Sequence, residues 1–376
     1  MSSNVIEVQT AVSGGIGLIT LNRPKALNAL SLPMIGALLA TLQAWRDDPA
    51  VLAVAIRGSN KIGRPGSPEA LFGGFCAGGD IRFFHQAALA QDPALGDFFT
   101  QEYTLNHLIQ TYPKPYIAFL DGVVMGGGMG LCQGKFRLAT QSTKMAMPET
   151  GIGLFPDVGG GYFLSRCPGH VGEYLALTGE TIGGAQAVAF GLADVCVPSQ
   201  DLPKLWASLQ ACGSVADVER WIANDVLATY AASAEPAPVW DKKIDVAFGL
   251  KSVASIVSAL EALGSKPARA AAATLRQRSP LLLHVVLEQI RRARSMTLAD
   301  DLRMERDMVE HCFLTRHLQR EGLTSETVEG IRALAIDKDF KPRWNPARID
   351  AVTPEMVQPF FTSPWAAEAH PLKLLA

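Results

Sequence analysis

Two acidic residues lie in an otherwise uncharged stretch of the chain, residues 147–161, with the sequence M-P-E-T-G-I-G-L-F-P-D-V-G-G-G. Glu149 and Asp157 have only glycine, proline, threonine and apolar neighbours there. Poor solvation raises the pKa of a carboxyl group and makes its charge unfavourable, so function is the better explanation for such acids. We therefore expect both to take part in chemistry, although either one alone could instead form a turn or cap a helix.

Two glycine clusters are placed where a strand should lead into a helix. The first is F-C-A-G-G-D at residues 75–80, and the second is V-V-M-G-G-G-M-G at residues 123–130. Glycine lets the backbone approach a ligand closely, and the first N–H groups of a helix point outward unpaired. Two such amides converging on one oxygen would form an oxyanion hole, in which one donor is typically worth about 2.7 to 4 kcal/mol in the transition state. The alternative is that the glycines only allow tight packing of helix on sheet.

The sequence does not match the common motifs for cofactor sites, metal sites and activated nucleophiles. From Gly126 the run places Leu131 where a dinucleotide fingerprint has Gly or Ala, and Gly134-Lys135 lacks the spacing of a phosphate loop. The chain has no G-x-S-x-G elbow, no H-E-x-x-H pair and no C-x-x-C pair. We therefore expect neither a cofactor nor a metal site.

The elements that must position these residues alternate between strand and helix. Apolar or β-rich runs predict strands at residues 5–8, 16–21, 51–56, 116–120, 136–139 and 144–147. Ser13-Gly14-Gly15 predicts a hairpin between the first two strands, and Ser31 is a predicted N-cap for a helix with Met34, Leu38 and Leu42 on one face. Further helices are expected from Ile81 and over residues 98–109. This alternation predicts an α/β core, with a Gly/Pro/Ser-rich surface insertion at residues 59–74.

The character of the chain changes near residue 231. The segment A-A-S-A-E-P-A-P-V-W is a Pro/Ala-rich connector, and helices are expected after it at residues 268–278, 281–294 and 298–313. The Ser279-Pro280 pair should separate the first of these from the second. We expect a core at residues 1–230 and a mainly helical region at residues 231–376, because 376 residues exceed the usual size of one domain.

Composition limits the partners and the compartment. With 34 Lys+Arg against 36 Asp+Glu the net charge is -2, and no basic stripe points to nucleic acid. No run resembles a membrane-spanning helix, and the start lacks the pattern of a signal or transit peptide. The six cysteines are scattered, which indicates buried free thiols in a reducing compartment. We expect a cytoplasmic protein that binds neither nucleic acid nor membrane.

Taken together, three motifs resemble the crotonase (enoyl-CoA hydratase/isomerase) superfamily: F-C-A-G-G-D, M-G-G-G-M-G and M-P-E-T-G-I-G-L-F-P-D-V-G-G-G. L-N-R-P-K-A-L-N-A-L near the start and V-E-G-I-R-A-L-A-I-D-K-D-F-K-P-R-W-N-P at residues 328–346 extend the resemblance over nearly the whole chain. It is strongest to the branch that hydrolyses 3-hydroxyisobutyryl-CoA in valine catabolism. The resemblance implies a crotonase-like spiral of ββα turns with a helical C-terminal region, an acyl-CoA substrate and no separate cofactor, and it leaves a homo-oligomer open.

The resemblance also assigns roles position by position. The oxyanion amides would be those of Gly79 and Gly127, with Gly78 and Asp80 beside them at the substrate. Glu149 matches the family's P-E glutamate, Asp157 matches an aspartate of the hydrolase branch, and Glu102 matches a further glutamate of the substrate site. The residues independently place Glu102 on an apolar helix face, because Phe98, Glu102, Leu105 and Ile109 are spaced four, three and four apart.

One position departs from the hydratase pattern. Hydratases of the family carry a second catalytic glutamate two residues after the glycine triplet, and this chain has Gly130 there. Addition of water to a double bond then lacks half of its acid/base apparatus. We expect hydrolysis of a β-hydroxyacyl-CoA thioester, with Glu149 as nucleophile or general base. A hydratase or double-bond isomerase, and a non-catalytic acyl-CoA-binding protein, are the alternatives. Lys338 is a candidate contact for the CoA phosphates.

Overall fold

A computed structural model describes residues 6–61, 71–230 and 236–376 of the chain. The chain forms two compact units, each assembled from three stretches of sequence. Unit 1 comprises Met1–Gly79, Leu105–Ala146 and Thr181–Pro238, and unit 2 comprises Asp80–Thr104, Met147–Glu180 and Val239–Ala376. This division interleaves the sequence, whereas the sequence suggested two contiguous parts that meet at residue 230. Helices far apart in sequence pack together in unit 2, and a contiguous boundary cannot describe that packing.

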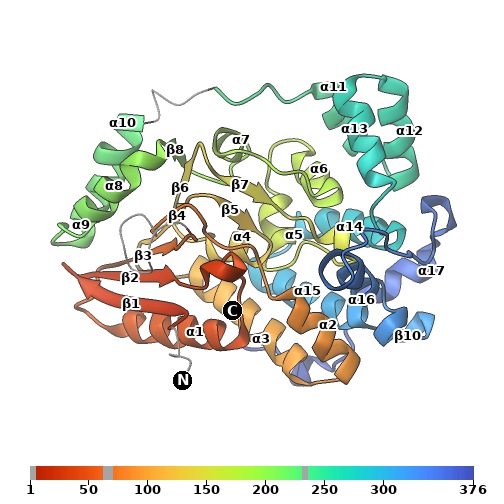
Figure 1. Ribbon diagram of the computed structural model, residues 1–376, viewed down its shortest axis with the longest axis horizontal. Helices are drawn as coiled ribbons and strands as arrows, with labels where there is room; N and C mark the ends of the chain where they lie inside the picture. The colour runs from red at the N-terminus through yellow and green to blue at the C-terminus, as the bar shows by residue number, and fades with distance from the viewer. Residues whose placement is uncertain (1–5, 62–70, 231–235) are drawn as a thin grey trace. The chain divides into compact units, whose positions relative to one another are not determined.

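Unit 1 is built on a six-stranded sheet of order β1-β2-β3-β4-β6-β8 (Figure 1). Its strands are β1 (Val8–Ser13), β2 (Ile16–Leu21), β3 (Ala53–Gly58), β4 (Tyr116–Leu120), β6 (Phe136–Thr140) and β8 (Val195–Val197). Only the β1-β2 pair is antiparallel, and every other neighbour pair in the sheet is parallel. The short strands β5 (Val123–Met125) and β7 (Lys144–Ala146) pair in a second, parallel sheet. A parallel sheet with helices confirms the predicted α/β class.

The strands follow the apolar runs closely. All five residues of β4 are buried, as expected for a central parallel strand covered on both faces. The Gly14-Gly15 hairpin is confirmed, because both glycines have positive φ (58° and 78°) and β1 pairs with β2 across them. The first predicted strand was placed too early: β1 begins at Val8, in register with Leu21, and Val5 lies outside the described residues.

The first helix of unit 1 carries the expected sequence signals. Ser31 caps α1 (Leu32–Asp47) by accepting a hydrogen bond from the Met34 N–H, and Met34, Leu38 and Leu42 are buried as predicted. The other α-helices that lie wholly in this unit are α4 (Gly127–Leu131), α7 (Gly184–Ala189), α8 (Leu202–Leu209), α9 (Val215–Arg220) and α10 (Ala228–Tyr230). Residues 62–70 of the predicted insertion and residues 231–235 of the predicted connector lie outside the described residues.

Unit 2 is mainly helical. It contains α2 (Ile81–Ala90), α5 (Gly160–Leu164), α6 (Val171–Thr178), α11 (Lys242–Phe248), α12 (Val253–Leu263), α13 (Lys266–Leu275), α14 (Pro280–Ala293), α15 (Leu298–Phe313), α16 (Glu326–Ile331), α17 (Pro354–Val357) and a two-stranded sheet of β9 (Leu314–Thr315) and β10 (Arg320–Glu321). Helix α3 (Ala94–Gln110) contributes residues to both units. The predicted break between α13 and α14 is confirmed, because Ser279 caps α14 and Pro280 is its first residue.

Two further features bear on the setting of the protein. Within residues 6–61, 71–230 and 236–376, no helix is long and apolar enough to cross a membrane. All six cysteines carry free thiols, and all except Cys196 are buried.

Candidate active site

Three acidic side chains that the sequence selected lie together in unit 2. Glu102, Glu149 and Asp157 are only 2%, 6% and 5% exposed. Burial raises the pKa of Glu102 well above its usual value, and the charges on Asp157 and Glu149 raise it further. Burial likewise raises the pKa of Glu149, with a second contribution from the charge on Asp157. The three carboxyl groups therefore form one electrostatically coupled set, and we call them the carboxyl cluster.

Asp157 has a partner that the sequence did not reveal. The hydroxyl of Tyr103, whose side chain is fully buried, donates a hydrogen bond to Asp157 Oδ2 at 2.9 Å. Burial raises the pKa of Asp157 to about 7, while the hydrogen bond from Tyr103 acts in the opposite direction. Asp157 therefore changes its charge near neutral pH. Only the position of Tyr103, next to Glu102 on the same helix, could have indicated this contact.

Helix α3 holds Glu102 and Tyr103 by means of aromatic packing within unit 2. Phe84 of α2 packs against Phe98 and Phe99 of α3, with ring centroids 4.8 and 4.9 Å apart. Phe99 in turn lies 5.8 Å from the ring of Phe313 on α15. The predicted apolar face is confirmed, because each of the four residues that define it is no more than 2% exposed.

Glu149 begins the short 3-10 turn η3 (Glu149–Ile152). Neighbouring segments hold this turn in place by hydrogen bonds and close packing. Thr150 Oγ1 donates to the Leu177 carbonyl at 3.1 Å, and Thr327 Oγ1 donates to the Gly153 carbonyl at 2.6 Å. Helix α16 approaches so closely that a Cβ on Gly330 would lie 2.3 Å from the carbonyl carbon of Ile152. The segment V-E-G-I-R-A-L at residues 328–334, which resembles the family, therefore packs against the turn that carries Glu149.

Two oxygens of the carboxyl cluster are unsatisfied. Glu102 Oε1 and Glu149 Oε2 are buried, and no group in the described part of the chain hydrogen-bonds to either. Buried polar atoms in folded proteins nearly always have a partner, so an exception calls for an explanation. A polar substrate that reaches these oxygens would supply the missing partners.

The predicted amide donors lie together in unit 1. A Cβ on Gly78, which has φ +103°, would lie 3.2 Å from the Met125 carbonyl oxygen and 3.5 Å from the Gly127 nitrogen. Hydrogen bonds tie the two loops, because the Cys76 N–H donates to the Val123 carbonyl and the Met125 N–H donates to the Cys76 carbonyl, at 2.9 and 3.0 Å. Among the described residues, no acceptor bonds the N–H of Gly79 or of Gly127. Both amides are therefore available to a ligand oxygen, as an oxyanion hole requires.

Asp80, the remaining predicted site residue, has a structural role. Its Oδ1 accepts a hydrogen bond from the Phe83 N–H at 3.4 Å and so caps α2. A substrate contact through Asp80 stays a prediction.

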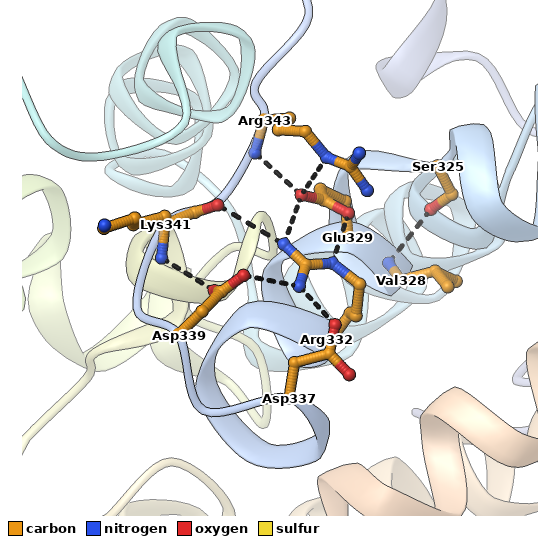
Figure 2. Close-up of polar contacts among 8 residues, drawn as sticks. All are labelled: Ser325, Val328, Glu329, Arg332, Asp337, Asp339, Lys341 and Arg343. Atoms are coloured by element: carbon orange, nitrogen blue, oxygen red, sulfur yellow. Dashed lines mark hydrogen bonds and ion pairs between the residues drawn. The ribbon is translucent and has the colours of Figure 1, made fainter.

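The family-like segment at residues 328–346 folds around the partly buried side chain of Arg332 (Figure 2). Arg332 forms two hydrogen bonds of 2.8 Å with Glu329 and binds Asp337 and Asp339 at 2.5 and 2.8 Å. The Arg343 N–H also donates to Glu329 at 2.8 Å. Burial alone would raise the pKa of Glu329, but the hydrogen bonds from these two arginines lower it to about 2. The loop at residues 337–343 is thereby fixed against the end of α16.

Unit 1 thus presents a pair of free backbone amides, and unit 2 presents a group of buried acids. Each is a kind of group that acyl-transfer chemistry uses. The description Enoyl-CoA hydratase/isomerase belongs to the family model that matches residues 16–361. The chain belongs to this family, as its motifs predicted.

Relatives with curated names agree on one activity. The chain is 41% identical over 356 residues to the 3-hydroxyisobutyryl-CoA hydrolase, mitochondrial, of Xenopus tropicalis, covering 93% of this chain and 87% of the relative. It is 37% identical over 370 residues to 3-hydroxyisobutyryl-CoA hydrolase 1 of Arabidopsis thaliana, covering 94% and 91%.

Solved structures share the fold over nearly the whole chain. A carnitinyl-CoA dehydratase from Mycobacterium thermoresistibile matches with a TM-score of 0.81 at 38% identity, covering 95% of this chain and 96% of that one. An enoyl-CoA hydratase from Rhodobacter sphaeroides 2.4.1 matches with a TM-score of 0.78 at 33% identity, covering 95% and 98%. The predicted crotonase-like fold is confirmed.

Proposed function

We propose that the protein hydrolyses a β-hydroxyacyl-CoA thioester, with 3-hydroxyisobutyryl-CoA as the favoured substrate, to the free hydroxy acid and CoA. The observation that carries this proposal is the carboxyl cluster, in which Glu149 and Asp157 are buried together while Gly130 stands where a hydratase has its second glutamate. Relatives that are 37 to 41% identical over most of the chain and are named as hydrolases of this substrate support it.

In the proposed mechanism the amides of Gly79 and Gly127 bind the thioester oxygen and stabilise the negative charge that develops on it. Glu149 either attacks the carbonyl carbon, giving an anhydride that water then cleaves, or removes a proton from the attacking water. In both routes the C–S bond breaks and CoA leaves as the thiolate. The raised pKa of Glu149 makes its ionised form a stronger base.

The other two acids recognise and orient. Asp157 would accept a hydrogen bond from the 3-hydroxyl of the substrate or orient Glu149. Burial raises the pKa of Glu102 well above its usual value, and in its protonated form this residue could donate a hydrogen bond to the same polar patch. Its unsatisfied Oε1 leaves room in the hydrogen-bonding pattern for that contact.

The loop at residues 337–343 is a candidate for contact with CoA. Lys338 has positive φ (57°) and is exposed, on a loop that Arg332 holds in place (Figure 2). A lysine in this position could bind a phosphate of the CoA moiety as a point charge. Gly78 and Asp80 would complete the acyl-CoA contacts near the amide pair.

Two alternatives have some support. The solved structures with the highest TM-scores quoted above are titled as a dehydratase and a hydratase, but Gly130 removes the second acid of that chemistry. A non-catalytic acyl-CoA-binding protein would not need to keep buried, mutually repelling acids at the energetic cost they impose. A cytoplasmic location and a place in valine catabolism stay predictions, and the Xenopus relative carries a mitochondrial name.

The test compares substrates that differ only in the hydroxyl. Free thiol is followed during incubation of the protein with 3-hydroxyisobutyryl-CoA and with isobutyryl-CoA. Because buried polar groups would remain unpaired with the second substrate, kcat/KM should favour the first by about 10²-fold or more. Asp157→Asn should narrow that ratio, whereas Asp300→Asn, at an exposed acid on α15, should leave it unchanged. Equal turnover of the two substrates, or no thiol release from either, would contradict the proposal.

A further inference from the structure

Two acids on α15 are buried without any role in the chemistry proposed above. Asp301 and Glu305 are both 0% exposed and lie one helical turn apart. Neither is neutralised by an ion pair in the described part of the chain. Burial raises the pKa of Asp301 to about 7, and burial followed by the charge on Asp301 raises that of Glu305. Two acids at such positions destabilise the fold unless they satisfy other buried groups.

The groups that they satisfy are backbone amides of the segment that follows Asp157. Glu305 accepts hydrogen bonds from the Gly159 N–H at 2.7 Å and from the Gly161 N–H at 2.9 Å, one on each carboxyl oxygen. Asp301 accepts from the Tyr162 N–H at 2.8 Å. Three of the four residues from 159 to 162 are therefore held by side chains of one helix.

A third side chain holds the segment before Asp157. Gln289 of α14 is fully buried, and its Nε2 donates to the Pro156 carbonyl at 2.7 Å and to Glu305 Oε1 at 3.3 Å. Glu305 and Gln289 are thus bonded to each other and to the backbone on both sides of Asp157. We call Gln289, Asp301 and Glu305 the anchor residues.

The backbone between these contacts adopts an unfavourable conformation. Val158 has φ +58°, a region that β-branched residues rarely occupy, and Gly159 follows with φ +83°. Such conformations persist where the surroundings over-determine them, and they cluster at functional sites. The approach is also close, because a Cβ on Gly161 would lie 2.2 Å from Asp301 Oδ1.

We propose that Glu305, assisted by Asp301 and Gln289, is the positioning residue that fixes the Asp157 segment in the conformation in which Asp157 meets Tyr103 and the substrate. Glu305 touches no substrate in this account, and it acts through the backbone of residues 156–161. The inference rests on the proposed function, because it assigns Glu305 to the placement of an acid of that site. A displacement of about 1 Å in a reacting group can lower a rate by about 10²-fold.

The first test uses Glu305→Gln, which keeps the size of the side chain but turns one acceptor oxygen into a donor that faces a backbone N–H. We expect kcat for thiol release from 3-hydroxyisobutyryl-CoA to fall about 10- to 100-fold, with KM changed less than about three-fold. Leu260→Ala, which opens a cavity at a fully buried residue of α12, is the control for lost stability. It should lower the melting temperature and leave kcat near the wild-type value.

The second test does not depend on activity. Hydrogen exchange of the backbone amides in residues 157–162 should accelerate about ten-fold or more in Glu305→Gln and stay unchanged in Leu260→Ala. If wild type releases no thiol but this exchange difference appears, the proposed function fails while the anchoring stands. Unchanged exchange in Glu305→Gln, or equal losses of kcat in both variants, would overturn the inference. If Glu305→Gln does not fold, the same two measurements are made on Asp301→Asn. Smaller changes are expected there, because Asp301 accepts a single backbone hydrogen bond and the one acceptor oxygen of Asn can keep it.

Discussion

The amide pair of unit 1 and the carboxyl cluster of unit 2 would contribute to the proposed reaction in opposite ways. Gly79 and Gly127 offer uncharged backbone donors, whose placement depends on loop conformation and on hydrogen bonds between main-chain atoms. Glu102, Glu149 and Asp157 offer ionisable side chains, and burial raises the pKa of each of them. The function of the amide pair therefore depends on the absence of side chains nearby, and that of the cluster depends on the identity of its side chains. Substitutions should distinguish the contribution of the amide pair from that of the cluster.

The largest effect should come from the chemistry of the cluster. Glu149→Gln removes the nucleophile or base while it keeps the volume, so kcat for thiol release should fall by about 10²- to 10⁴-fold. KM should change little, because the amide pair is intact. Glu180→Gln, at an exposed acid of the same unit, is the control and should match wild type. Retention of more than a tenth of the wild-type kcat by Glu149→Gln would remove that residue from the mechanism.

The next effect tests the amide pair through added bulk. In Gly78→Ala the new Cβ meets the Met125 carbonyl oxygen at 3.2 Å in a backbone conformation that only glycine favours, so the pair should be misplaced. A fall in kcat of about 10- to 10²-fold is expected, less than the full loss of one oxyanion donor. Gly191→Ala is a matched control, because Gly191 also has positive φ (76°) but nothing lies within 4 Å of its Cβ position. Similar kcat values for the two variants would show that the spacing of the loops is not what matters.

A smaller effect should appear in the pH profile. The hydroxyl of Tyr103 stabilises the ionised form of Asp157, so Tyr103→Phe should raise the pKa of Asp157 above its value of about 7. A hydrogen bond to a charged group is worth about 1.5 to 3 kcal/mol, which corresponds to about one to two pH units. The acid limb of kcat/KM should move to higher pH by that amount, with activity recovering at alkaline pH. An acid limb at the same pH in both proteins would show that ionisation of Asp157 does not control the activity.

The smallest effect concerns stability. Because the pKa of Asp157 is raised in the folded state from 3.8 to about 7, the folded state binds more protons than the unfolded state between these pH values. The free energy of unfolding therefore falls as pH rises from about 4 to 7 and stays low above that range. Asp157→Asn removes a penalty of at most about 4 kcal/mol at pH 8, reduced because Tyr103 then donates to a neutral amide oxygen instead of a carboxylate. Its melting temperature should exceed that of wild type at pH 8 and be close to it at pH 4.

The sequence predicted much of the fold because its signals are local. The hairpin at Gly14-Gly15, the Ser31 cap and the fully buried strand β4 each follow from a few neighbouring residues. The Glu102 face was also predictable, because three apolar neighbours at helical spacing define it. The interleaved units were not predictable, because they depend on packing between segments that are distant in sequence.

The sequence predicted which residues form the carboxyl cluster. It did not predict the hydrogen bonds that position them. Leu298, Leu302, Glu305 and Val309 repeat the spacing of four, three and four that drew attention to Glu102, so the same reasoning applied to α15 would have selected Glu305. No sequence pattern indicates the hydrogen bond between Tyr103 and Asp157. The same is true of the hydrogen bonds that Glu305 accepts from backbone amides. Hydrogen bonds that join distant segments require three-dimensional structure.

The measurement that tests the central claim most directly compares two reactions in one wild-type preparation. Free thiol released from 3-hydroxyisobutyryl-CoA is followed beside the loss of the double bond of crotonyl-CoA at the same enzyme and substrate concentrations. Because Gly130 replaces the second acid of a hydratase, thiol release should be faster by about 10²-fold or more. Rapid hydration of crotonyl-CoA without release of thiol from the hydroxyacyl-CoA would contradict the account.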